Sequence, residues 1–329
     1  MACPMQSLLA RLGSRGDRDD WFRYLPPELR NSIDTFGTTG GSQPREEEAQ
    51  ETAENERSLS SGSQVVRAAG SIAVRGRVWT LAQEARGCRW VQAAMAGAVR
   101  EEGAALASEL RGHVVAAAES PHANHVLQLC INTLEAEDIQ FIIDEVVEVG
   151  TIRVATNKYG CRIIQRLVER CPRQQVQGIV QTILDDVRGL STRPYSNFVL
   201  QSLIMHGSCD DRQRIVSIAL EGAAELCRVP HGCVVVLAAF EVEEPERQAA
   251  LAKRVGQEEG LLVSMACSRQ GAALVSRLFD VLPEREHCRT LAVFAAAAGT
   301  VGATDHGRET LFAMGIYIAG CASTDSVGQ

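Results

Sequence analysis

A six-residue pattern recurs along this chain at an almost constant spacing, and it constrains the fold more than any other feature of the sequence. Each copy has a small residue, then Cys or Asn, then Arg, His or an aromatic residue, then two apolar residues and Gln. The four clear copies are 87–92, 123–128, 160–165 and 196–201. Their second positions are 36, 37 and 36 residues apart. Such spacing predicts an array of similar units, each packing on its neighbours.

Three weaker copies continue the spacing towards the C-terminus, at 232–237, 271–276 and 307–312, with steps of 36, 39 and 36 residues. Between the copies, apolar residues recur at helical spacing, as at Ile139, Ile142 and Val146, while the alternation typical of strands is scarce. A unit of this length accommodates two helices of about 12 residues and their turns. The sequence therefore predicts an all-α solenoid of about seven repeats, each 36–39 residues long.

The N-terminal fifth of the chain has a different composition. Residues 1–64 contain Pro26–Pro27, an acidic cluster and a Ser-rich stretch, with few large apolar residues at helical spacing. This composition predicts a disordered tail over 1–64 and places the repeat domain at 65–329. Residues 21–29 hold three aromatic side chains, so this island is interpreted either as a linear docking motif or as an N-terminal cap on the domain.

Charge and cysteine content narrow the class of protein. The chain has 33 basic and 41 acidic residues, a net charge of −8, so we do not expect generic, charge-driven nucleic-acid binding, although one local face can still bind. No apolar run is long enough to span a membrane, and the first residues do not resemble a secretion signal. Eleven cysteines without a C-x-x-C pair favour reduced thiols. We therefore expect a cytoplasmic protein.

The pattern divides each unit between a core face and a polar face. The small residue follows a turn and is expected to open the second helix, where residues four apart share a face. In the second copy, Asn124, His125 and Gln128 then project together, while Val126 and Leu127 point into the core. Amide groups both donate and accept hydrogen bonds, as a base edge requires, and planar side chains can stack on bases. We call such a set of three residues a polar triple. One polar triple alone would suit a polar helix surface, whereas four in register favour RNA contact.

At these residues the chain resembles the Pumilio-type (PUF) repeats. The resemblance covers about 65–315, strongly in the first four units and weakly in the last three. Residues 159–168 are the closest single match, and 81–92 resemble a typical first repeat of the family. The resemblance implies a right-handed solenoid whose second helices line a concave face. It also implies single-stranded RNA bound at one base per repeat.

Carried over residue by residue, the family's code assigns adenine to Cys-Arg-x-x-Gln and uracil to Asn-(Tyr/His/Phe)-x-x-Gln. Because RNA runs antiparallel to the protein in the family, units one to four imply 5′-UAUA-3′. The implied RNA-binding residues are Cys88, Arg89, Gln92, Asn124, His125, Gln128, Cys161, Arg162, Gln165, Asn197, Phe198 and Gln201.

Units five to seven lack the Gln of the pattern. Leu237, Ser276 and Phe312 stand in its place, so these units are interpreted as packing repeats that do not read bases. With four bases read, we expect micromolar or weaker binding to isolated RNA.

The resemblance implies a non-enzymatic, monomeric protein that binds mRNA, regulates its stability or translation, and recruits deadenylation or translational-repression factors. Nucleophile, dinucleotide and phosphate-loop motifs are missing, and the His and Cys spacing does not form a metal site, so we expect neither catalysis nor a cofactor. The alternative is a degenerate solenoid that binds protein, or that takes part in ribosomal RNA processing in the nucleolus. The acidic charge and the last three units favour this alternative.

Overall fold

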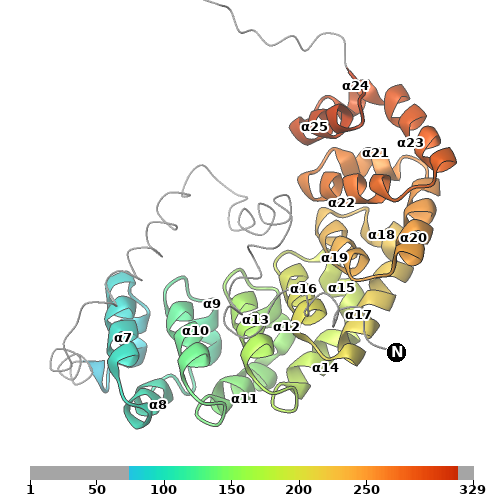
Figure 1. Cartoon of the computed structure of the whole chain (residues 1–329). Coiled ribbons are helices and arrows are strands. Elements are labelled where there is room, and N and C mark those ends of the chain that lie inside the picture. Colours follow the sequence, from blue (N-terminus) through green and yellow to red (C-terminus); the bar gives the residue numbers. More distant parts are fainter. Residues whose placement is uncertain (1–73, 318–329) are drawn as a thin grey trace, which may run out of the picture. The chain divides into compact units, whose positions relative to one another are not determined.

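The computed structural model describes residues 74–317, and the regular elements there are all helices, stacked in order along the chain (Figure 1). Seven of them carry the repeated pattern and are called the motif helices here. They are α7 (Ala85–Gly97), α10 (Ala123–Thr133), α13 (Gly160–Arg170), α16 (Ser196–His206), α19 (Pro230–Glu241), α22 (Arg269–Asp280) and α25 (Asp305–Ala313). These helices define units one to seven. The prediction of an all-α repeat array is confirmed.

Two further sets of helices complete the array. After each motif helix except the last comes a companion helix: α8 (Arg100–Ser108), α11 (Gln140–Val149), α14 (Gln177–Asp185), α17 (Cys209–Glu221), α20 (Pro245–Gln257) and α23 (Glu284–Ala296). Before each motif helix comes a short helix: α6 (Val78–Ala82), α9 (Val114–Glu119), α12 (Thr151–Ala155), α15 (Val187–Thr192), α18 (Ala223–Leu226), α21 (Leu261–Ala266) and α24 (Ala298–Val301). The expectation of two helices per unit was therefore wrong, because a short third helix occupies what was taken as a turn.

The motif helices form one continuous row. Each packs on the next, from α7 through α10, α13, α16, α19 and α22 to α25. The apolar pair of the pattern fills the space between them, since Val126, Leu127, Ile163 and Ile164 are completely buried. The pattern's core face is thus where the sequence placed it, and successive polar triples lie on neighbouring helices.

The small residue of the pattern is explained by a close approach of backbone. A Cβ atom built on Gly232 would lie 2.1 Å from the carbonyl oxygen of Leu226, in the short helix before it. In unit four, Ser196 uses the same approach to donate its hydroxyl to the Leu190 carbonyl at 2.7 Å. The start of each motif helix is pressed against the end of its short helix, which leaves room only for a small side chain.

In units one and two, a carboxylate accepts hydrogen bonds from the backbone N–H groups at the start of the short helix, an arrangement that we call closure. Glu145, on companion helix α11, accepts from the backbone N–H groups of Gly112 and Val114 at 2.7 and 3.1 Å. Glu109 accepts in the same way from Gly76 and Val78, at 2.7 and 3.0 Å. Each carboxylate satisfies the open N–H groups at the start of a short helix and places a negative charge at its positive end.

Replacing Glu145 with Ala is expected to lower the free energy of unfolding by about 1–2 kcal/mol, because two N–H groups at the start of α9 lose a charged acceptor. Glu148→Ala, an exposed position on the same helix, is the control and should change stability by less than about 0.5 kcal/mol. Urea denaturation followed by circular dichroism measures both. Equal stability of the two variants would contradict the proposed closure.

The predicted tail (1–64) and its boundary with the repeat domain lie outside the described residues, as does the aromatic island at 21–29. Cysteines between residues 74 and 317 are thiols. Within this part of the chain, the helices are too short or too polar to cross a bilayer.

Candidate nucleic-acid interface

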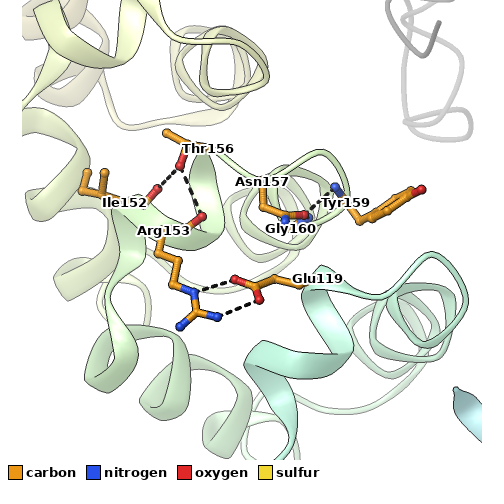
Figure 2. A network of polar contacts seen from close by, with 7 residues as sticks. All are labelled: Glu119, Ile152, Arg153, Thr156, Asn157, Tyr159 and Gly160. Atoms are coloured by element: carbon orange, nitrogen blue, oxygen red, sulfur yellow. Dashed lines mark hydrogen bonds and ion pairs between the residues drawn. The ribbon is translucent and has the colours of Figure 1, made fainter. Parts of the chain in front are cut away.

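Polar side chains fix the point at which the motif helices begin. The Asn157 Oδ1 atom accepts from the backbone N–H groups of Tyr159 and Gly160 at 2.8 and 3.0 Å (Figure 2). Ser120 accepts from His122 and Ala123 in the same place one unit earlier. Both residues lie four positions before the Cys or Asn of the pattern. They therefore set the position of the helix turn that carries the polar triple.

An ion pair joins the short helices of units two and three. The guanidinium of Arg153, on α12, donates to both carboxylate oxygens of Glu119, at the end of α9, at 2.6 and 2.7 Å (Figure 2). The hydroxyl of Thr156 donates to the carbonyls of Ile152 and Arg153, which closes the end of α12. A bidentate pair is directional, so it orients unit three relative to unit two.

The Cys or Asn of every triple, which holds the second position of the pattern, is buried. Cys88 and Cys161 are 4% and 3% exposed, and Asn124 and Asn197 are completely buried. Burial raises the pKa of the Cys161 thiol to about 11, so this side chain remains a small neutral group at neutral pH. Such a group leaves space beside the helix without adding a charge.

In unit two, the protein itself satisfies the Asn124 amide. Its nitrogen donates to the carbonyls of Ser120 and Pro121, at 2.8 and 3.0 Å, and its oxygen accepts from the Gln128 side chain at 2.8 Å. Asn124 thereby ties the turn before α10 to Gln128. In unit four, the amide nitrogen and oxygen of Asn197 are buried without a hydrogen bond, which is costly for a polar group.

In units two to four, the glutamine is more accessible than the Cys or Asn at the second position of the pattern. Gln128, Gln165 and Gln201 are half-buried, and each side-chain nitrogen donates to the residue four positions earlier. Gln92 is 8% exposed, and its nitrogen donates to the Cys88 sulfur at 3.8 Å. Each amide is thus oriented by its own helix.

The residues at the third position of the pattern supply planar and cationic groups. Arg89, His125 and Arg162 are exposed, and Phe198 is half-buried. Beside them, the Lys158 ammonium lies 5.3 Å from the centre of the Tyr159 ring. An acidic chain thus has a cationic and aromatic strip along units one to four, which is suited to a polyanion with stacked bases.

This strip ends at unit five. The third residues there and in unit six are Val234 and Ala273, and the place of Gln is taken by the buried Leu237 and then by Ser276. In unit seven, Glu309 and Phe312 are exposed. The structure therefore brings all twelve predicted site residues onto four adjacent helices, and the remaining units differ in chemistry.

Sequence analysis missed Ser120 and Asn157, which position the triples without belonging to them. The signal was present, because Ser or Asn just before a helical pattern marks a helix start. Ser268 and Thr304 take the same place in units six and seven, where each accepts from a glycine N–H.

A family model described as "Pumilio-family RNA binding repeat" matches residues 113–147, 151–184 and 187–218. These segments contain the short and motif helices of units two, three and four and most of their companion helices.

Similar proteins and structures carry the same family name. "Pumilio domain-containing protein C6G9.14" of Schizosaccharomyces pombe is 30% identical over 115 residues, 35% of this chain and 17% of that protein. "Pumilio homolog 11" of Arabidopsis thaliana is 23% identical over 243 residues, 73% of this chain and 41% of that protein. This chain thus spans less than half the length of these relatives.

Among solved structures, PUF-8 in complex with PBE-RNA superimposes with a TM-score of 0.63 at 20% identity, covering 93% of this chain and 88% of that one. The Puf3 RNA binding domain, bound to a Cox17 RNA 3′ UTR recognition sequence, superimposes with a TM-score of 0.65 at 17% identity, covering 79% and 80%. At these identities, the superpositions establish a shared helical-repeat fold.

Proposed function

Since this chain belongs to the Pumilio family of RNA-binding repeat proteins, we propose that it binds single-stranded RNA along the motif helices, one base per unit across α7, α10, α13 and α16. The observation that carries the proposal is the in-register strip of polar triples on these four packed helices. Base reading needs amide groups at base edges and planar groups between bases. Both kinds of group recur here at one set per unit.

Within each triple, the roles follow from burial. The glutamine is our main base-edge contact in units two to four, since it is more accessible than the Cys or Asn of the same triple. Asn124 positions Gln128 through their hydrogen bond. Neutral Cys88 and Cys161 leave space for a purine, whereas the Asn units favour a pyrimidine. Arg89, His125, Arg162 and Phe198 are the stacking groups between successive bases.

With RNA antiparallel to the chain, this assignment gives 5′-UAUA-3′ for units one to four. The test is fluorescence anisotropy of the full chain with 5′-UUUUUAUA-3′ and with 5′-UUUUCCCC-3′, at about 150 mM salt, where non-specific phosphate binding is weakened. We expect micromolar or weaker binding and a preference of about tenfold or more for UAUA, equivalent to about 1.4 kcal/mol. Equal binding of both RNAs would refute base reading.

The biological role we propose follows from the ligand. The proposed role involves no catalysis by this chain. The protein binds mRNA in the cytoplasm and alters its stability or translation by recruiting deadenylation or repression factors. Absence of RNA binding in the anisotropy test would instead favour a protein-binding scaffold.

A further inference from the structure

Unit seven places an exposed aromatic ring where units one to four carry glutamine. Phe312 lies on α25, five residues after Gly307, the small residue of the pattern in this unit, and is 70% exposed. The equivalent Leu237 of unit five is buried, and Ser276 of unit six has no ring. Of units five to seven, only the last therefore offers a planar face at this position.

Phe312 does not face the core of unit seven. The residues that face the core in this unit are covered: Leu311 is 1% exposed and Thr310 is 7% exposed. Phe312 is turned out of that core and holds the pattern position of the glutamines in the earlier motif helices. Because α22 packs on α25 as the other motif helices pack on each other, the ring belongs to the same row of helices as the proposed RNA-binding strip, separated from its end by units five and six.

A second exposed ring stands against the first. Tyr317 is 79% exposed, and its ring centre lies 6.1 Å from that of Phe312 with the planes at 90°. An edge-to-face pair of this kind is mutually supporting and leaves ring surface open to solvent. Two adjoining exposed rings form a contiguous apolar surface, and contiguous apolar surface marks an interaction site more often than single exposed side chains do.

The surroundings favour a base over a phosphate. Glu309, one turn before Phe312, would repel a phosphate, and the neighbouring Arg308 is engaged by Asp305. His306 lies 3.6 Å from the Glu309 carboxylate. Stacking is independent of charge and of hydrogen-bond pattern. The ring can thus hold a base without reading it.

Resting on the proposed function, we propose that Phe312, supported by Tyr317, stacks on an RNA base three nucleotides to the 5′ side of UAUA. At one base per unit, units five and six lie beside the two nucleotides before UAUA without reading them. Unit seven then lies beside the first nucleotide of a seven-nucleotide site. The RNA is then read at its 3′ end and clamped at its 5′ end.

The test compares 5′-ACCUAUA-3′ with the same RNA carrying an abasic first nucleotide, by anisotropy with the full chain. Phe312→Ala should weaken binding of the intact heptamer by about five- to a hundredfold, the range expected for one stacked base, and leave binding of the abasic RNA unchanged. Phe312→Trp should retain the affinity. Val293→Ala, at an exposed apolar position on companion helix α23, is the control.

Equal affinity of wild type and Phe312→Ala for the intact heptamer would overturn this inference and point to a protein partner for the aromatic pair. Failure of the wild-type chain to distinguish UAUA from CCCC is a separate result, which would overturn the proposed function itself.

Discussion

Simultaneous replacement of Gln128, Gln165 and Gln201 by Ala should abolish measurable binding to 5′-UUUUUAUA-3′. Each variant position loses one base-edge amide, worth about 1 kcal/mol or more. Three losses weaken binding by about a hundredfold or more, which takes a micromolar complex beyond detection. Anisotropy titration of the full chain measures the effect.

The control for this variant is the triple replacement of Gln174, Gln177 and Gln181 by Ala. These three glutamines are exposed on or next to companion helix α14, away from the motif helices. The control chain should bind as the wild type does. Retention of UAUA binding by the motif-helix variant, with its circular dichroism spectrum unchanged, would favour the scaffold function.

The largest expected loss of stability follows from Asp211→Ala. The carboxylate of Asp211, 7% exposed, accepts two hydrogen bonds from Arg173 at 2.6 and 2.9 Å, and a third from the Ser208 hydroxyl at 2.7 Å. It joins the start of α17 to the segment before α14. Removing it should lower the free energy of unfolding by about 2–3 kcal/mol, which is less than the cost of breaking a fully buried pair, because Arg173 is partly exposed. Asp185→Ala, which removes an exposed partner of Arg214, should cost less than about 1 kcal/mol.

The effect of Asp211 should also depend on pH. Hydrogen bonds from Arg173, and secondarily from Ser208, lower the pKa of the Asp211 carboxyl in the folded state. Its contribution is therefore complete above the unfolded-state pKa of about 3.9 and is lost as the pH falls through the lower folded-state value. Urea denaturation at pH 7 and near pH 3 should show the gap between wild type and Asp211→Ala narrowing at the lower pH. A gap that widens on acidification would contradict this account.

The sequence predicted the repeat and the core accurately, because both appear as residues that recur at a regular spacing along the chain. Val126, Leu127, Ile163 and Ile164 are buried as the pattern requires, and the motif helices of units two to four begin at the predicted small residue. The short helices were missed because four to six residues are too few to show helical periodicity. They are stabilised by packing and by partners distant in sequence, such as Glu145.

The site was predictable only in part. Spacing placed the polar triples on one face, but it does not give the depth of a side chain. Asn124 and Gln128 are equivalent in periodicity, yet one is completely buried and the other half-buried. That difference arises from hydrogen bonds to the turn before the helix, which no periodic pattern encodes. The RNA contacts of all twelve residues remain predictions.

Closure by Glu109 and Glu145 determines which segments of the array contain all of their own hydrogen-bond partners. A fragment that ended with motif helix α10 would keep α9 but lose the carboxylate for its first N–H groups, since Glu145 lies on α11. The smallest segment of unit two that contains its own partners thus runs from Gly112 to the end of α11. The modular element of this protein is therefore the sequence of short, motif and companion helices. A graft or truncation in its N-terminal half should be cut after a companion helix, even though the six-residue pattern suggests other boundaries.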